Sequence, residues 1–348
     1  MRVAIWTTSS LEPDYEAVSK EIFSIAKKLN KSWIFAVSPH LTFKFSLTKK
    51  YLGFNPAFYP LLRILFPLLE YFFDVNLVYG DISPWVYYKT LTKRPIIHTI
   101  TQSSNNPQLE FLLRCKKIIV QAASTQKQLL SLGISEESIE LWYPGVDLDL
   151  FSPAEKKLVS GQKIMILFAT APRTKEEMEG RGCHLLIEAA GLDSSILYRF
   201  LYRPWRSEYT SLVATQKAIH QSGVNNIELS NIAEPEMNKI YTQFNLTVIP
   251  YTQESGGKEC PNSALESLAS GIPVLVSNKC PFSNFIHKHK CGIVFEPTPK
   301  SLLWATNQAL NNIEELSLNS RQVAEKYLNF STLAQRYKIL LFNAQAPQ

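Results

Sequence analysis

Short apolar runs rich in β-branched residues alternate along the chain with longer segments of helical periodicity. Segment 16–29 places apolar residues at spacings of three and four from Val18 to Leu29, which predicts an amphipathic helix. The next apolar run, at 32–38, is short and is typical of a buried strand. Because strands that alternate with helices form βαβ units, the pattern predicts an α/β fold built on parallel sheets.

The same reasoning assigns elements along both halves of the chain. Strands are expected at 2–7, 32–38, 77–79, 96–99, 117–120 and 139–142, and then at 163–169, 198–201, 227–230, 246–249, 273–276 and 292–295. Helices are expected at 16–29, 125–132, 183–191, 207–222, 234–243, 262–269, 299–310, 317–328 and 331–342.

A turn-rich segment, 143–153, separates the two series and continues as a predicted linker to Gly161. We therefore expect two Rossmann-like, doubly wound domains, at 1–155 and 156–330, with a helix in 331–348 that packs back on the first domain. Ligands of open parallel sheets bind at the carboxyl ends of the strands. Functional residues are thus expected in loops that follow strands, in a cleft between the two facing domains.

Charge and cysteine content narrow the function classes. The net charge of +6 would suit an anionic substrate or an anionic membrane surface, and it is equally compatible with neutral background. The most apolar stretch, 60–73, is too short to span a bilayer and is interrupted by Arg63, Pro67 and Glu70. The five cysteines form no CxxC pair, which favours reduced thiols and a cytoplasmic protein over a zinc site or a disulfide framework.

The most informative stretch is 247–276, in which a strand, a loop and a helix follow one another. The helix opens near Asn262, and the amide N–H groups of Asn262, Ser263 and Ala264 are expected to point out of its end. Such a helix start carries partial positive charge and can bind a diphosphate. Glu266, in the first turns of the same helix, is placed to accept hydrogen bonds from a ribose diol.

Residues 261–274 (PNSALESLASGIPV) resemble the donor-site motif of the retaining GT-B glycosyltransferases of family 4, the group 1 type. That family carries two glutamates eight positions apart, and Glu266 matches the second, whereas the first position holds Lys258. Three alternatives remain open. Glu259 takes the first role after a one-residue shift, Glu254 takes it from a longer loop, or Lys258 marks a different donor or an inactive site.

Three further stretches, 139–153, 181–190 and 234–250, resemble segments of the same family. The first half of the chain resembles it only in its alternation and in PIIHT at 95–99. The resemblance implies the GT-B architecture, in which two Rossmann-like domains face an interdomain cleft. It also implies that Arg173 and Arg181 bind the donor diphosphate, an arrangement to be weighed against solvated loop charges.

Two positions of the first half are candidates beside the transferred sugar. His98 follows a strand and is either a site residue or a hydrogen-bonded structural histidine. The family often has a second histidine three positions later, where this chain has Thr101, which could line the cleft with Gln102. The loop after the first strand lacks the usual glycines and offers Glu12 and Asp14 instead.

The resemblance implies transfer of a sugar from a nucleotide diphosphate sugar to a hydroxyl of a glycan or lipid-linked acceptor, with retention. It implies no cofactor and no metal, and no motif for nucleic acid accompanies it. The alternative is a catalytically inactive relative that binds a nucleotide, a glycan or a partner. Segment 43–73 mixes lysines and arginine with aromatic residues, which predicts either peripheral membrane contact at the inner face or a helical pair packed in the first domain's core.

Overall fold

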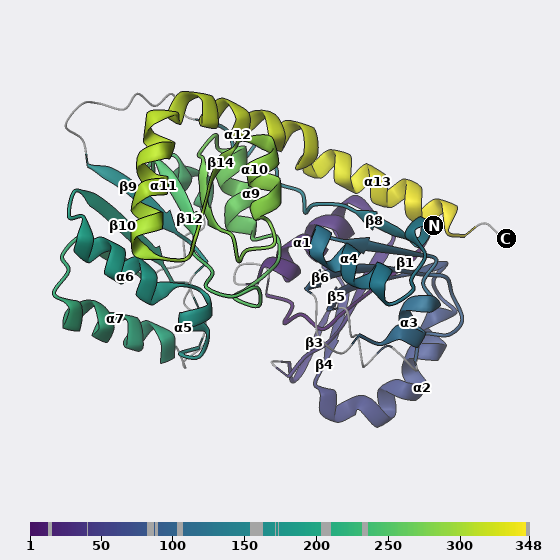
Figure 1. Ribbon diagram of the computed structural model, residues 1–348. Helices are drawn as coiled ribbons and strands as arrows, with labels where there is room; N and C mark the ends of the chain where they lie inside the picture. Colours follow the sequence, from purple (N-terminus) through teal and green to yellow (C-terminus); the bar gives the residue numbers. More distant parts are fainter. Residues whose placement is uncertain are drawn as a thin grey trace. The chain divides into compact units, whose positions relative to one another are not determined.

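The computed structural model describes residues 1–12, 16–39, 41–81, 87, 90–102, 107–153, 163–170, 172, 174–202, 210–231 and 236–345. Its contacts separate into two compact units (Figure 1). Unit 1 comprises Met1–Pro144 together with Ser331–Gln348, and unit 2 comprises Gly145–Phe330.

The described residues of unit 1 build an eight-stranded sheet in the order β3-β4-β2-β1-β5-β6-β7-β8. Its strands are β1 (Val3–Thr7), β2 (Ser32–Val37), β3 (Phe43–Ser46), β4 (Tyr51–Phe54), β5 (Val75–Asp81), β6 (Ile96–Gln102), β7 (Lys117–Val120) and β8 (Ile139–Leu141). All neighbours are parallel except β3, which pairs antiparallel with β4. The strand order reverses between β1 and β5, the kind of position where doubly wound sheets bind ligands.

Helices cover both faces of this sheet. The helical elements are α1 (Ala17–Lys28), η1 (Pro56–Phe58), α2 (Tyr59–Glu70), α3 (Leu109–Leu113), α4 (Ala123–Ser131), η2 (Glu136–Ser138) and α13 (Phe330–Asn343). On one face, Trp6 of β1 is buried against Phe35 of β2 and against Phe66 of α2. This cluster extends to Phe111 of α3. Alternation along each strand sends the next side chains, such as Tyr79 of β5, to the opposite face.

Segment 43–73 differs from the predicted helical pair. Residues 43–54 form the β3–β4 hairpin, and only the following part is helical, as η1 and α2. The physical reason is the period-two pattern of Phe43, Lys44, Phe45 and Ser46, which suits an edge strand. Alternation in this strand is inverted, because the two phenylalanines are exposed while Lys44 turns back to form an ion pair with Glu12 at 3.1 Å.

Unit 2 holds a six-stranded sheet of parallel neighbours in the order β11-β10-β9-β12-β13-β14. Its strands are β9 (Ile164–Phe168), β10 (Ile196–Leu201), β11 (Ile227–Ser230), β12 (Leu246–Ile249), β13 (Val274–Ser277) and β14 (Gly292–Phe295). Its helices are α5 (Glu177–Gly180), α6 (Cys183–Leu192), α7 (Thr210–Ser222), α8 (Met237–Tyr241), α9 (Asn262–Ala269), α10 (Ser283–His289), α11 (Pro299–Asn311) and α12 (Ile313–Tyr327).

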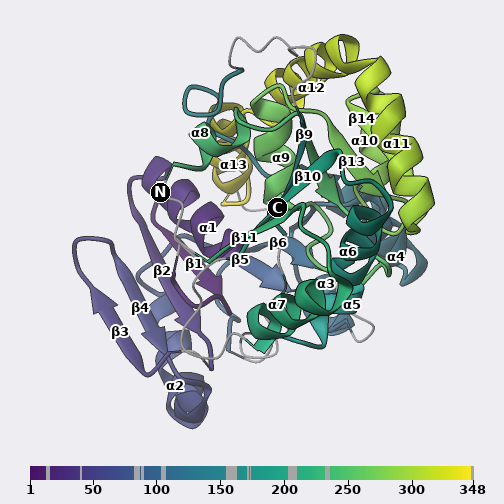
Figure 2. The same ribbon diagram turned by 90° about the vertical axis from the view of Figure 1, so that its left-hand side faces the viewer.

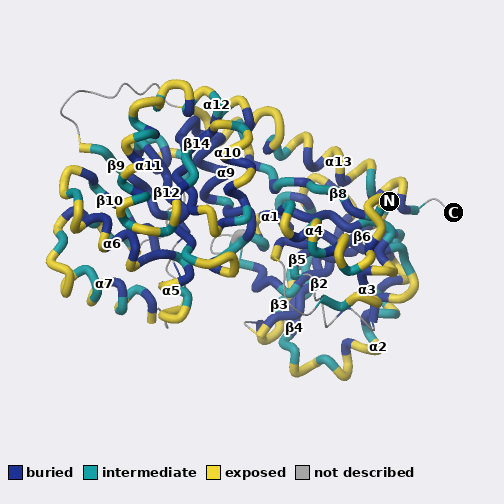
Figure 3. Tube along the Cα trace, viewed as in Figure 1, coloured by how far each residue is buried: buried dark blue, intermediate teal, exposed yellow. Residues whose placement is uncertain are grey.

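These helices form two layers around the second sheet, with α6 and α7 on one side and α9 and α12 on the other (Figure 2). The central strands β12 and β13 are buried along their whole length, within the dark blue core of unit 2 in Figure 3. Two doubly wound sheets covered by helices confirm the predicted α/β fold. In the described part of the chain, no helix combines the length and apolarity that a membrane span requires.

Candidate functional site

The strand order of unit 2 reverses between β9 and β12, which are parallel neighbours. Loops that leave the carboxyl ends of two such strands diverge to opposite faces and leave a crevice at the sheet edge. The loop after β9 leads to α5 and α6, and the loop after β12 leads to α9. Glu259, Arg181 and the start of α9 therefore all come from this edge of the sheet.

Glycines allow these two loops to pack backbone against backbone. Gly182 has a φ of +75°, and a Cβ there would overlap the carbonyl oxygen of Pro250. At Gly257, a Cβ would overlap the hydroxyl of the fully buried Tyr251. Thr252 completes the contact, since its amide donates to Gly180 O at 3.1 Å and its hydroxyl to Glu179 O at 2.7 Å. The two loops at this edge of the sheet are thus in direct backbone contact.

The first turn of α9 presents unused hydrogen-bonding groups. The amides of Asn262 and Ser263 have no acceptor in the described part of the chain. The Ala264 amide differs from the prediction, because the close first turn lets it donate to Pro261 O at 3.0 Å. Ser263 is only 7% exposed, and its buried hydroxyl has no partner among the described residues.

Glu266 is placed one turn further along α9 and is 4% exposed. The hydroxyl of Tyr241, from the end of α8, donates to its Oε2 at 3.2 Å. Tyr241 is itself fully buried and lies edge-on to Phe151, with ring centroids 6.1 Å apart. The carboxylate is therefore held in a fixed orientation by a side chain that the sequence analysis did not single out.

The three positions that compete for the first glutamate of the motif have different surroundings. Glu259 is buried, with 3% exposure, whereas Glu254 is exposed. Lys258 turns toward the helix, where its Nζ donates to Asn262 Oδ1 at 2.9 Å. A buried carboxylate and an ammonium group thus both lie next to the first turn of α9.

The structure describes only one of the two arginines that were expected to bind the donor diphosphate. Arg181 donates through Nη1 to Thr170 O at 3.0 Å and pairs with Glu177 through Nε at 3.3 Å. These contacts hold Arg181 beside the end of β9, where the Thr170 hydroxyl is buried and without a partner among the described atoms. Arg173 lies outside the residues that the structure describes.

In unit 1, the loop after β1 is organised by a carboxylate instead of glycines. Glu16 Oε2 accepts from the Ser10 amide, the Ser10 hydroxyl and the Ser19 hydroxyl, each at 2.7 Å. Next to them, Ser9 is buried and its hydroxyl has no partner in the described part of the unit. Glu12 is engaged by Lys44, and Asp14 lies outside the described residues.

His98 and Thr101 of β6 are both buried. Nε2 of His98 lies 2.9 Å from the carbonyl oxygen of Asp81, and its ring packs edge-on against Phe111 of α3. Burial lowers the pKa of His98 to about 4, so the ring is neutral and donates from Nε2. The Thr101 hydroxyl donates to Gly80 O at 3.3 Å. These contacts place His98 between the sheet and α3, and its buried Nδ1 has no partner among the described residues.

The sequence analysis missed the buried hydroxyls of Ser9 and Thr170, although each directly follows the first strand of its unit. Their position at the carboxyl end of a strand was the available signal. Tyr241 carried no such signal, because only the folded chain brings α8 to α9. Within the described part, no group of three or more His, Cys, Asp and Glu side chains is arranged to hold a metal ion.

Residues 215–327 match a protein-family model described as Glycosyl transferases group 1. This segment contains the loop after β12 and all of α9, and so it includes Glu254, Glu259, Ser263 and Glu266. A comparison with curated proteins finds no match.

Solved structures share the fold over the full length of the chain. A glycosyltransferase from Rickettsia africae superposes with a TM-score of 0.77 at 14% identity, covering 100% of this chain and 99% of that one. HepE of Anabaena, in complex with UDP, gives a TM-score of 0.79 at 13% identity over 99% and 100% of the two chains. Sucrose-phosphate synthase from Thermosynechococcus elongatus gives 0.76 at 14% identity over 98% of each. The chain is thus similar to group 1 glycosyltransferases over residues 215–327, and over its full length it has the GT-B fold of these solved structures.

Proposed function

We propose that the protein transfers a sugar from a nucleoside diphosphate sugar to a hydroxyl of a glycan or of a lipid-linked saccharide, with retention of configuration. In this proposal the donor diphosphate binds at the first turn of α9, and Glu266 accepts hydrogen bonds from the donor ribose. Arg181 and Arg173 contribute positive charge, and Glu259 faces the transferred sugar, with Glu254 as the alternative. HepE of Anabaena has been crystallised with UDP and with UDP-glucose, so uridine diphosphate sugars are the first donors to test.

The observation that carries this proposal is the unpartnered hydroxyl of Ser263. A buried polar group without a hydrogen bond costs about 1–3 kcal/mol, so its retention requires an explanation, of which a bound ligand is one. Ser263 lies in the first turn of α9, beside free amides and at the point where the strand order reverses. A diphosphate oxygen at this place would accept from the hydroxyl and from the amides together.

The same groups account for catalysis. As the bond between the sugar and the diphosphate breaks, negative charge grows on the leaving phosphate oxygens. Donors that are already oriented in the ground state stabilise this charge without rearrangement. The first turn of α9 has this property, because its amides are fixed by the helix and Ser263 is fixed by burial. Protein groups thus supply the electrostatic stabilisation directly.

Two serines of the same helix test the donor site. Ser263→Ala removes a hydroxyl that has no partner among the described residues, so it should leave stability unchanged or raise it slightly. It should weaken binding of UDP, or of whichever nucleoside diphosphate binds, about tenfold or more, since it removes a hydrogen bond to a charged group. Calorimetric titration gives the affinity, and urea unfolding gives the stability.

The matched control is Ser267→Ala. Ser267 lies on the same helix, and its hydroxyl is bonded to Thr247 and to Ile272 O at 2.8 Å each. This change should lower stability by about 1–2 kcal/mol and leave the affinity for the nucleotide unaltered. Equal affinities in Ser263→Ala and in the unmodified protein would refute the placement of the diphosphate, and absence of sugar transfer from every donor tested would favour the inactive alternative.

A cytoplasmic location also belongs to the proposal. The five cysteines are all free and buried, and burial raises the pKa of Cys115, Cys183, Cys280 and Cys291 to about 12. Such thiols remain protonated and unreactive, which suits a reducing compartment.

A further inference from the structure

Large apolar side chains are exposed on one part of unit 1. Nine of the twenty exposed large apolar side chains among the described residues fall within Phe43–Phe72. Single exposed apolar residues are normal on a protein surface, but a concentrated group marks an interaction surface. We call this group the β3–α2 surface and define it by Phe43, Phe45, Leu61, Ile64, Leu68 and Phe72.

Helix α2 is apolar on two opposite sides. Its Leu62 and Phe66 are fully buried in the core of unit 1. On the other side, Leu61, Ile64 and Leu68 are 58%, 66% and 56% exposed. A surface helix with one partner usually carries polar residues on its outer side. The outer side of α2, which is yellow in Figure 3, therefore has the composition of a second buried side.

Strand β3 extends the same surface. Phe43 and Phe45 are 59% and 52% exposed on this edge strand. Phe43 contacts Phe54, and Phe54 contacts Phe66 of α2, with ring centroids 5.8 Å and 6.2 Å apart. The hairpin and the helix are thus joined by a continuous series of aromatic contacts, and they present their outer apolar side chains as parts of one structure.

The charges on this segment have one sign at the surface. Lys49, Lys50 and Arg63 are exposed. The one carboxylate between residues 43 and 73 belongs to Glu70, which is fully buried and accepts hydrogen bonds from Asn76 and from the backbone of 92–94. No negative charge of this segment therefore offsets its cations.

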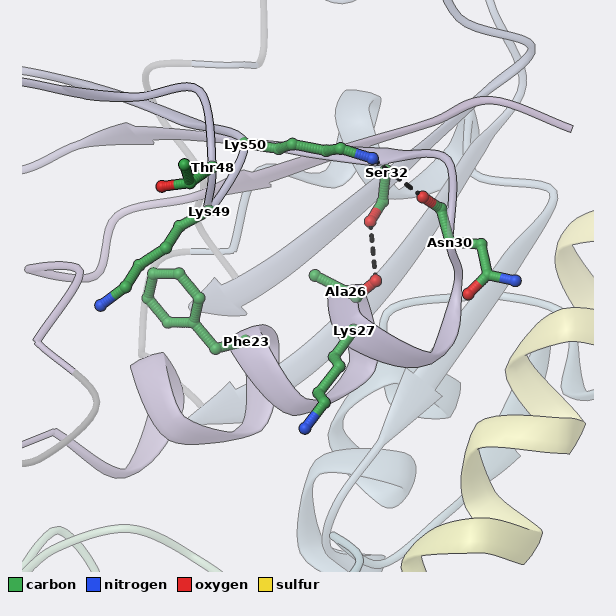
Figure 4. A pocket seen from close by; sticks show the side chains of 8 residues that line it. All are labelled: Phe23, Ala26, Lys27, Asn30, Ser32, Thr48, Lys49 and Lys50. Atoms are coloured by element: carbon green, nitrogen blue, oxygen red, sulfur yellow. Dashed lines mark hydrogen bonds between the residues drawn. The ribbon is translucent and has the colours of Figure 1, made fainter.

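A lysine-lined hollow lies at the turn of the hairpin (Figure 4). It is a cavity of about 630 Å³ whose walls include Lys27 from α1, Lys49 and Lys50 from the turn, and the ring of Phe23. Lys50 donates to Asn30 O at 3.1 Å, while the side chain of Lys49 extends beside the Phe23 ring and that of Lys27 points away from it. The hollow therefore places positive charge at the turn of the hairpin, on the α1 side of the sheet, whereas α2 covers the other side.

We propose that the β3–α2 surface docks onto a bilayer that contains anionic lipids, with α2 lying in the plane of the interface. An apolar helix side that carries Arg63, next to a hairpin whose turn carries Lys49 and Lys50, combines the apolar and cationic groups that such interfaces bind. A second copy of this chain is a poorer occupant, because a two-fold contact would bring Lys49, Lys50 and Arg63 of both copies together. The proposal requires no donor nucleotide, so its test is separate from that of the donor site.

The test is sedimentation of the full chain with lipid vesicles. We expect binding to vesicles of phosphatidylcholine mixed with phosphatidylglycerol, much weaker binding to phosphatidylcholine alone, and a decrease at high salt. The variant Leu61→Ser, Ile64→Ser, Leu68→Ser should bind at least about tenfold more weakly, because it removes buried apolar area from the bound state. A second variant replaces three cations by glutamine (Lys49→Gln, Lys50→Gln and Arg63→Gln). Its affinity for anionic vesicles should fall about tenfold or more, whereas its affinity for neutral vesicles should not change.

Matched controls come from unit 2. Leu192, Val213 and Leu318 are 58%, 65% and 60% exposed, so their joint replacement by serine removes a similar exposed apolar area. Lys217, Lys288 and Lys300 are exposed and provide the charge control. Both control variants should bind vesicles as the unmodified protein does. Equal loss in control and test variants, no binding to any vesicle, or self-association through α2 in the absence of lipid would each overturn the proposal.

Discussion

Two buried serines of α9 differ in their hydrogen bonding within the described part of the protein. Ser263 and Ser267 lie one turn apart on α9 and are both buried, yet Ser267 has two partners and Ser263 has none among the described residues. Folding explains Ser267, because its hydroxyl joins α9 to β12 and to the start of β13. Contacts within the described part of the protein do not explain Ser263, whereas the donor diphosphate that we propose would use its hydroxyl.

His98 gives a prediction for pH dependence. Its pKa in the folded protein is about 4, below the ordinary value of 6.5, because burial disfavours the charged ring. The unfolded chain therefore binds more protons between these two values, and stability must fall as the pH falls. From pH 7 to pH 5, we expect His98 to account for a loss of about 2 kcal/mol in the free energy of unfolding. Urea unfolding at both pH values measures it.

The variant His98→Gln isolates this contribution, because an amide can still donate to Asp81 O and does not titrate. Its stability should change less between pH 7 and pH 5 than that of the unmodified protein. His287→Gln, at an exposed position, should leave the original pH dependence in place. Parallel pH profiles for the protein and His98→Gln would show that His98 is charged or exposed in solution.

Secondary-structure elements show which parts of the fold the sequence could predict. Strands β7, β11, β12 and β14 and helix α9 have the predicted bounds, because a run of apolar residues between turn formers leaves little choice. The β3–β4 hairpin was not predicted, since the two phenylalanines of β3 face outward and its pattern therefore carries no core signal. The start of α9 could be predicted from Pro261 and Asn262, whereas the role of Tyr241 could not, because it depends on packing between distant segments.

The joined loops at the carboxyl edge of unit 2 give a prediction at this scale. Gly182 and Gly223 share a positive φ, of +75° and +70°, but a Cβ at Gly223 would meet open space. Gly223→Ala should therefore lower the free energy of unfolding through backbone strain alone, by about 1–2 kcal/mol. Gly182→Ala adds an overlap with Pro250 O. We therefore expect it to lower the free energy of unfolding by about 1–3 kcal/mol more than Gly223→Ala does. Urea unfolding compares the two.

Nucleotide affinity provides the second readout for these glycines. Displacing the Gly182 loop moves Arg181 and the loop that leads to α9, so Gly182→Ala should also weaken nucleotide binding. Gly223→Ala, which follows α7, should not. An equal effect of both variants on affinity would mean that the packing of the two loops does not position the donor site.

At the scale of the whole molecule, the chain passes between its two units twice, near Pro144 and near Phe330. The two passages are tied together at the border of unit 2. Val146 N donates to Leu328 O at 2.7 Å, and Phe330 N donates to Val146 O at 3.0 Å. Gly145 permits this approach, because a Cβ there would lie 2.6 Å from Cα of Phe330. Helix α13 then returns to unit 1, so the end of the chain completes the unit with which the chain begins.

Tyr337 of α13 tests whether this return stabilises unit 1 locally. It is buried against Trp142, with ring centroids 5.1 Å apart, and its hydroxyl lies 2.9 Å from Thr99 Oγ1. Tyr337→Phe should cost about 1–2 kcal/mol and speed hydrogen exchange in β6 and β7, while exchange in β9 to β14 stays unchanged. Tyr198→Phe in β10 is the matched control, because that buried hydroxyl has no described partner and its loss should be neutral or stabilising. Faster exchange in both units after Tyr337→Phe would contradict a local role and would mean that the two units unfold as one cooperative body.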